Sequence, residues 1–186
     1  MMPLRCCAAA WTVAVTVWLT AGYADDRGLS EATHPAWSEV TWPFLIDQWG
    51  TGRAFTCQAA DCGSAVSIYL RAKVGFCSCS TGVADDDEID RVGDLDLLGA
   101  QRTALASGRP VRIGWMAGRE RTFLVEGPLR AKKVALEIAV ANKCDAVVAT
   151  VVSERELAPD IEQAALRFLG GDAVLRWAEA STGLSQ

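Results

Sequence analysis

Residues 133–152, KVALEIAVANKCDAVVATVV, contain two apolar runs rich in branched residues, and the pair Asn142-Lys143 separates them. Asparagine tolerates the backbone of a tight turn, and Val and Ile favour extended strands. The pattern predicts a β-hairpin with Cys144 just past its turn, although the alanines leave a helix as the competing interpretation. A hairpin here makes an antiparallel sheet the framework of the fold.

Further strand signals lie before this hairpin. Val66, Ile68 and Leu70 alternate with more polar residues, as in a half-buried strand, and residues 73–79 are expected to continue it. Residues 111–115 and 122–125 predict a second hairpin. Residues 42–49 and 53–55 predict two more strands, joined by a glycine-containing turn at residues 50–52.

Three stretches predict helices. The first begins at Asp85 with a run of acids, which suits the positive end of a helix dipole; Gly93 is expected to weaken or split it, and Gly108 with Pro110 to end it. Residues 159–169 and 172–182 are amphipathic and are separated by two glycines.

These elements predict an α+β fold. We expect a mostly antiparallel sheet of about five or six strands, with the middle helix and the two C-terminal helices on one face. Residues 25–41 are polar and lack a sustained period, so they predict a flexible lead, or a short helix around Ser38. Residues 42–186 are expected to form a single α+β domain.

The first 24 residues predict a signal peptide. Arg5 supplies the positive charge, residues 8–21 form an uncharged apolar run, and residues 22–24 end it with small residues flanking a tyrosine. We expect cleavage after Ala24. An uncleaved membrane anchor is the alternative, because the uncharged stretch approaches the ~20 residues of a spanning helix. The protein is therefore expected to be exported, periplasmic rather than extracellular, and to contact a membrane only if this segment remains attached.

The charge pattern argues against nucleic acid as a partner. The chain has a formal net charge of −5, and its Lys and Arg residues are scattered instead of forming a basic stripe. Nucleic-acid binding depends on basic clusters that neutralise phosphates.

Four of the seven cysteines lie close together in the sequence: Cys57, Cys62, Cys77 and Cys79. An exported compartment favours disulfides, and we expect Cys57 or Cys62 to pair with Cys77 or Cys79. Cys6 and Cys7 fall in the signal peptide, so with Cys144 the mature chain has an odd count, which leaves one thiol free or intermolecular.

The same four cysteines offer two other interpretations. As thiolates they could hold a soft metal, copper in preference to zinc, because the single-residue gap between Cys77 and Cys79 does not fit zinc-site spacing. They could also form a thiol-exchange site, although the two-residue gap of the usual redox motif is absent.

The sequence offers little for catalysis. Its single histidine, His34, lies in the expected flexible lead, so no base is placed beside a serine or cysteine nucleophile. The acids of residues 85–96 are interpreted as a solvated helix start, with calcium binding and an acidic docking face for a basic partner as the alternatives. Arg119-Glu120-Arg121 is expected to be solvated charge at a hairpin tip.

We therefore expect an exported, disulfide-stapled accessory or binding protein without catalytic activity or cofactor, which serves another exported protein or complex. Two alternatives remain: a periplasmic copper- or zinc-binding protein that uses Cys57, Cys62, Cys77 and Cys79, and an enzyme that uses carboxylates alone.

Overall fold

The fold is taken from a computed structural model, which describes residues 36–127 and 131–183. The expected signal peptide with Cys6 and Cys7, and also His34, lie outside the described residues. None of the helices in the described ranges combines the length and the apolar character needed to cross a bilayer.

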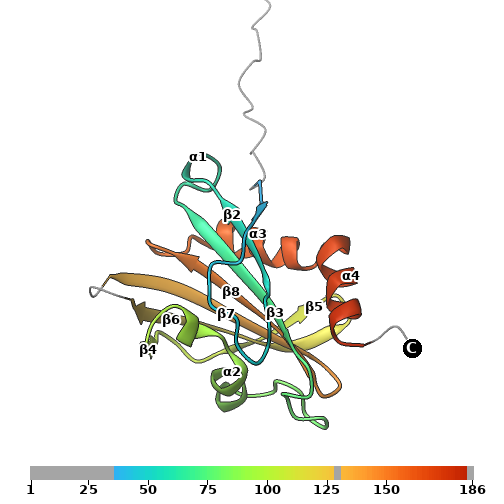
Figure 1. Ribbon diagram of the computed structural model, residues 1–186. Coiled ribbons are helices and arrows are strands. Elements are labelled where there is room, and N and C mark those ends of the chain that lie inside the picture. The colour runs from blue at the N-terminus through green and yellow to red at the C-terminus, as the bar shows by residue number, and fades with distance from the viewer. Residues whose placement is uncertain (1–35, 128–130, 184–186) are drawn as a thin grey trace, which may run out of the picture. The chain divides into compact units, whose positions relative to one another are not determined.

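The protein is built on one antiparallel sheet of eight strands (Figure 1). The strand order is β1-β2-β3-β8-β7-β6-β4, and β5 also pairs with β6. The expected α+β class is confirmed, with a larger sheet than the sequence predicted. The strands are β1 (Ser38–Val40), β2 (Arg53–Cys57), β3 (Val66–Lys73), β4 (Gln101–Ala104), β5 (Arg109–Ile113), β6 (Met116–Glu126), β7 (Lys132–Asn142) and β8 (Asp145–Ser153).

The helical elements lie between the strands and after them. They are α1 (Ala59–Cys62), α2 (Asp86–Val92), the 3-10 turn η1 (Leu95–Leu97), α3 (Pro159–Leu169) and α4 (Asp172–Ser181). The two C-terminal helices match their predicted ranges to within one residue.

The hairpin predicted for residues 133–152 is confirmed as β7 and β8. Asn142 pairs with Asp145, and Lys143 takes the positive backbone angle (φ 56°) that so tight a turn requires. Nearly every residue of β8 is buried, because both faces of the sheet are covered there. This explains why the run is continuously apolar and does not alternate.

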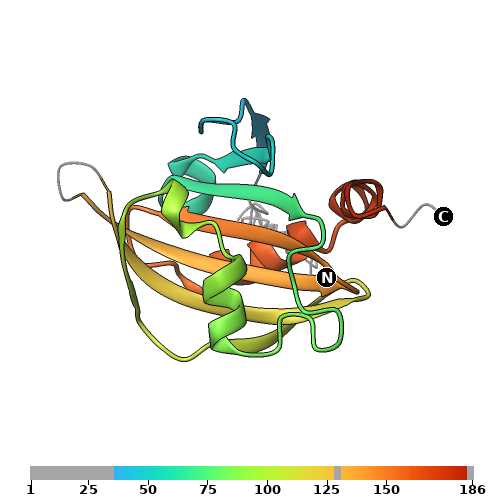
Figure 2. The same ribbon diagram turned by 60° about the horizontal axis from the view of Figure 1, so that its bottom comes forward.

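The helices cover opposite faces of the sheet, and the expectation of a single covered face is wrong. Ala165 and Leu169 of α3 pack with Ile68 and Ile138 on one face. On the other face, Ile89 of α2 belongs to a separate apolar cluster. Figure 2 shows α2, in green, across the near face of the sheet. The spacing of apolar residues in α2 indicates that the helix packs on the sheet. It does not specify which face of the sheet, because β7 is apolar on both faces.

The N-terminal part departs most from the sequence prediction. Residues 38–40, placed in the expected flexible lead, form the edge strand β1. Residues 42–49 form an aromatic loop instead of a strand, closed by an isolated bridge between Asp47 and Gly50. Strand β3 ends at Lys73 and turns at Gly75 (φ 67°), so residues 74–79 do not continue it.

Helix α2 begins as the sequence predicts. The carboxylate of Asp85 accepts a hydrogen bond from the backbone N–H of Glu88 (2.8 Å), and further acids occupy the first turn. The helix ends before Gly93, which confirms the predicted break. The chain then makes η1 and strand β4 in place of the longer helix expected up to Gly108.

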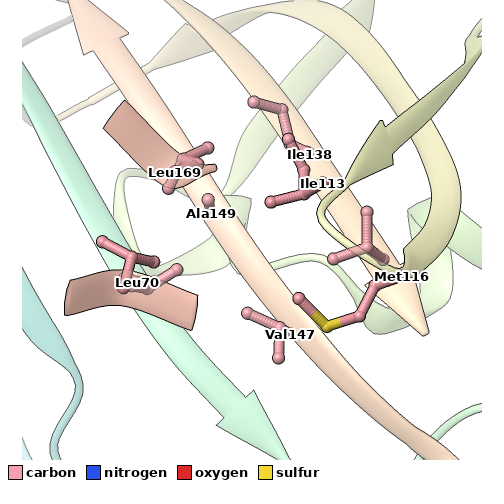
Figure 3. A pocket seen from close by; sticks show the side chains of 9 residues that line it. Leu70, Ile113, Met116, Ile138, Val147, Ala149 and Leu169 are labelled. Atoms are coloured by element: carbon pink, nitrogen blue, oxygen red, sulfur yellow. The ribbon is translucent and has the colours of Figure 1, made fainter. Parts of the chain in front are cut away.

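The core between the sheet and the helices α3 and α4 contains a small apolar cavity (Figure 3). Its volume is about 10 Å³, and Leu70, Met116, Val147 and Leu169 are among the residues that line it. A cavity without polar partners stays dry and leaves its lining side chains without contacts.

Val147→Ile should therefore raise the free energy of unfolding by about 0.8 kcal/mol, because the added methylene fills this cavity. Urea unfolding measures the effect. The control is Val148→Ile, whose side chain points to the opposite face and is fully buried against α2. There the same methylene should overpack the core and lower stability by about 1 kcal/mol or more. Equal effects of the two substitutions would contradict the cavity.

Candidate functional site

The five cysteines that the structure describes form two disulfides and do not form a quartet. Cys57 bonds to Cys62, Cys79 bonds to Cys144, and Cys77 keeps a free, buried thiol. The expectation of a disulfide-stapled protein with one unpaired cysteine is confirmed. The predicted cross-pairing is wrong, because α1 turns Cys62 back towards Cys57 and the chain after β3 bends towards the β7–β8 turn.

A metal site at Cys57, Cys62, Cys77 and Cys79 stays a prediction. Sulfurs joined in a disulfide are not thiolate ligands, so such a site requires both bridges to be reduced first. Among the residues that the structure describes, no group of three or more His, Cys, Asp or Glu side chains is placed to hold a metal ion.

A polar cleft lies on the α2 side of the sheet, where charged side chains and two aromatic rings surround a volume of about 320 Å³. The aromatic loop forms one wall, β3 the floor, and α2 with η1 the opposite wall. The lining residues are Asp47, Gln48, Trp49, Arg71, Lys73, Phe76, Asp90, Arg91, Gly93, Asp94, Asp96 and Arg102.

The floor of the cleft is a buried ion-pair network around Asp94. Arg71 makes a two-pronged contact with the Asp94 carboxylate and also donates to Asp47 (2.7 Å). Lys73 lies 2.7 Å from Asp94 and donates to the backbone carbonyls of Val92 (2.7 Å) and Gly93 (3.0 Å). Lys73 therefore caps the C-terminal end of α2, where the helix dipole favours a positive charge.

Glu137 lies beneath this network and is 1% exposed. Its two carboxyl oxygens accept hydrogen bonds from the backbone N–H of Asp94 (2.7 Å) and the hydroxyl of Thr150 (2.9 Å). Burial raises the pKa of Glu137 to about 8, helped by the neighbouring Asp94 carboxylate and opposed by these hydrogen bonds and Lys73. Gly93 allows the close approach, because a Cβ there would lie 3.0 Å from a Glu137 oxygen.

The aromatic loop, residues 42–49, is held down at several points. Trp42 and Phe44 pack edge-on against Tyr69 of β3, with ring centroids 6.1 and 4.7 Å away. Trp49 packs on Phe76, with centroids 4.5 Å apart. The ion pair between Asp47 and Arg71 ties the loop to the floor of the cleft.

Two aliphatic side chains of this anchored loop do not pack. Leu45 is 91% exposed and Ile46 is 74% exposed. Single exposed apolar residues are common on protein surfaces, but adjacent ones on a firmly held loop form a contact point that needs little ordering on binding.

Two acids of α2 join elements together, whereas Asp85, Asp87 and Asp96 are exposed. Asp86 accepts from Arg119 (2.6 Å) and Asp90 from Arg121 (2.9 Å), which ties α2 to β6. The expected solvated hairpin tip at residues 119–121 is therefore wrong. Glu120 points to the other face of the sheet, where it is buried and pairs with Arg109 (2.8 Å).

The buried charges were missed at the sequence level. Arg71 and Lys73 alternate with apolar residues and are therefore easily interpreted as the solvent side of a strand. Glu137 gave a usable signal, because it is the single acid within the first apolar run, residues 133–141. A lone acid in a buried strand requires partners and commonly marks a polar network.

The buried acids of the cleft stabilise the fold through their hydrogen bonds, which favours a structural role for them over a catalytic one. Asp94 and Glu137 are buried, and each is occupied by hydrogen-bond donors from the protein itself. The carboxylate-enzyme hypothesis stays a prediction, with these two acids as its candidates.

No protein-family model matches the chain, and a search of curated proteins finds no related sequence.

Proposed function

We propose that the chain is an exported binding protein that serves another exported protein, without catalysing a reaction itself. The observation that carries the proposal is the pair Leu45 and Ile46, exposed at the tip of a loop that aromatic packing and an ion pair hold in place. The two disulfides support the exported setting, where such bonds persist.

The loop should lose little conformational entropy on binding, because it is ordered beforehand. A flexible loop loses conformational entropy when it binds, whereas this loop is already ordered by Trp42, Phe44 and Trp49. Burying two large aliphatic side chains contributes about 1.5–3 kcal/mol each. The matching surface on the partner is expected to be an apolar pocket wide enough for two adjacent aliphatic side chains.

The double substitution Leu45→Ser and Ile46→Ser should weaken the partner complex at least about tenfold without unfolding the protein, because neither side chain packs in the core. A photo-crosslinking residue at position 45, in the full chain exported by its own cell, should give one discrete adduct that the Ile46→Ser background diminishes.

Leu105 provides the matched control, since it is exposed (54%) and lies outside the aromatic loop. Leu105→Ser should leave the complex unchanged, and a crosslinker at position 105 should give no such adduct. Adducts of equal yield from both positions, or none from position 45, would count against the proposal.

A further inference from the structure

Three cysteines converge beside the β7–β8 turn. The disulfide between Cys79 and Cys144 joins this turn to the segment after β3. Cys77 lies on the same segment, and its backbone N–H donates to the carbonyl oxygen of Cys144 (3.0 Å). Its thiol contacts the neighbouring carbonyl oxygen of Lys143 (3.5 Å).

This backbone hydrogen bond brings Cys77 within disulfide reach of Cys144. The two Cα atoms are at most about 6.9 Å apart. This limit is the sum of the N–Cα bond of Cys77, the 3.0 Å hydrogen bond and the distance from the carbonyl oxygen of Cys144 to its Cα. Disulfides join Cα atoms about 4.4–6.8 Å apart. The Cα separation is therefore compatible with a Cys77–Cys144 disulfide in place of the Cys79–Cys144 bridge.

The two pairings differ in which thiol faces the solvent. Cys77 is buried and Cys79 is exposed. With Cys79 bonded to Cys144, the free thiol is protected; with Cys77 bonded to Cys144, the free thiol is accessible.

We propose that Cys77, Cys79 and Cys144 form a thiol–disulfide exchange site. The Cys77 thiolate attacks the sulfur of Cys144, the Cys77–Cys144 bond forms and the Cys79–Cys144 bond breaks. Cys79 leaves as a thiolate and takes up the proton that Cys77 released, so the exchange consumes no oxidant or reductant. The exposed Cys79 thiol is then available to attack a disulfide in another molecule.

The surroundings of Cys77 keep this exchange slow near neutral pH. Burial raises the pKa of the Cys77 thiol, and the carboxylates of Glu88 and Asp145 add to this effect, while Arg91 opposes it. Because the thiolate is the attacking species, the exchange should quicken as the pH rises.

Cys79→Ser tests the alternative pairing directly. The variant, purified oxidised from its exported compartment and alkylated after denaturation without reduction, should contain no labelled cysteine, because Cys77 and Cys144 have bonded. Labels on both Cys77 and Cys144 would overturn the proposal. The control is Cys77→Ser, which keeps the Cys79–Cys144 bridge and should also show no label.

The native protein gives an independent test that does not rely on folding of a variant. Glutathione disulfide is added to the folded protein at pH 7 and pH 9, and the modified cysteine is identified by fragmentation mass spectrometry. Modification at Cys79, with a rate at least about tenfold higher at pH 9, is expected. Modification at Cys77, or none at either pH, would contradict the exchange.

Discussion

Asp94→Ala is expected to lower the free energy of unfolding by about 3–5 kcal/mol, the largest effect among the substitutions considered. The substitution leaves Arg71 and Lys73, which are 2% and 3% exposed, buried without the carboxylate that both contact. Asp47 remains as a partner of Arg71, but it lies at the mouth of the cleft and is itself 2.7 Å from only one guanidinium nitrogen. Equilibrium urea unfolding at pH 7 measures the loss.

The matched control is Asp96→Ala, two residues further along the chain. Asp96 lines the same cleft but is exposed, and the described residues provide no ion pair for it. Its replacement should change stability by no more than about 0.5 kcal/mol. The same small effect from both substitutions would contradict this prediction. It would mean that Arg71 and Lys73 reach water once Asp94 is removed, so that their charges do not depend on Asp94.

Glu137→Gln is expected to become more stable relative to the wild type as the pH rises. The difference in unfolding free energy between the two proteins should grow by about 3 kcal/mol from acidic to neutral pH. In the folded protein the pKa of Glu137 is about 8, whereas the unfolded chain has the ordinary value of 4.5. Between these two values the folded state holds a proton that the unfolded state has released, so the wild type loses stability from this group as the pH rises from 4.5 to 8. The amide keeps the shape of the protonated acid and does not titrate.

Urea unfolding of both proteins across pH 4.5–8 checks this expectation. The difference in unfolding free energy between Glu137→Gln and the wild type reports on Glu137 and the groups coupled to it, because the distant carboxylates titrate equally in both. A difference that grows with pH supports a protonated, buried Glu137. A difference that is constant with pH would mean that Glu137 titrates at its ordinary value, held as a carboxylate by Lys73 and its hydrogen bonds.

The two substitutions test different parts of one network, and their effects should not add. The carboxylate of Asp94 raises the pKa of Glu137, and the backbone N–H of Asp94 donates a hydrogen bond to the Glu137 carboxyl group. In the Asp94→Ala background the backbone donor remains but the carboxylate is gone. The pH dependence that Glu137 causes should therefore shrink, which a double-mutant cycle detects.

Local sequence patterns determined the secondary structure of much of this protein. The hairpin of β7 and β8, the strands β2 and β3, the two C-terminal helices and the break at Gly93 all follow from the spacing of apolar residues and from the residues that end elements. These features depend on neighbours within about a dozen residues, so their signal is present in the sequence itself.

The tertiary structure alone decided the face on which α2 packs, the disulfide partners and the charged cleft. A strand that is apolar on both sides does not encode which face a helix covers. Arg71, Asp94 and Glu137 are far apart in sequence and meet only because β3, β8 and β7 are neighbours in the sheet. Likewise, Cys144 becomes the partner of Cys79 only when the β7–β8 turn meets the segment after β3, a proximity that strand order creates and that no local spacing contains.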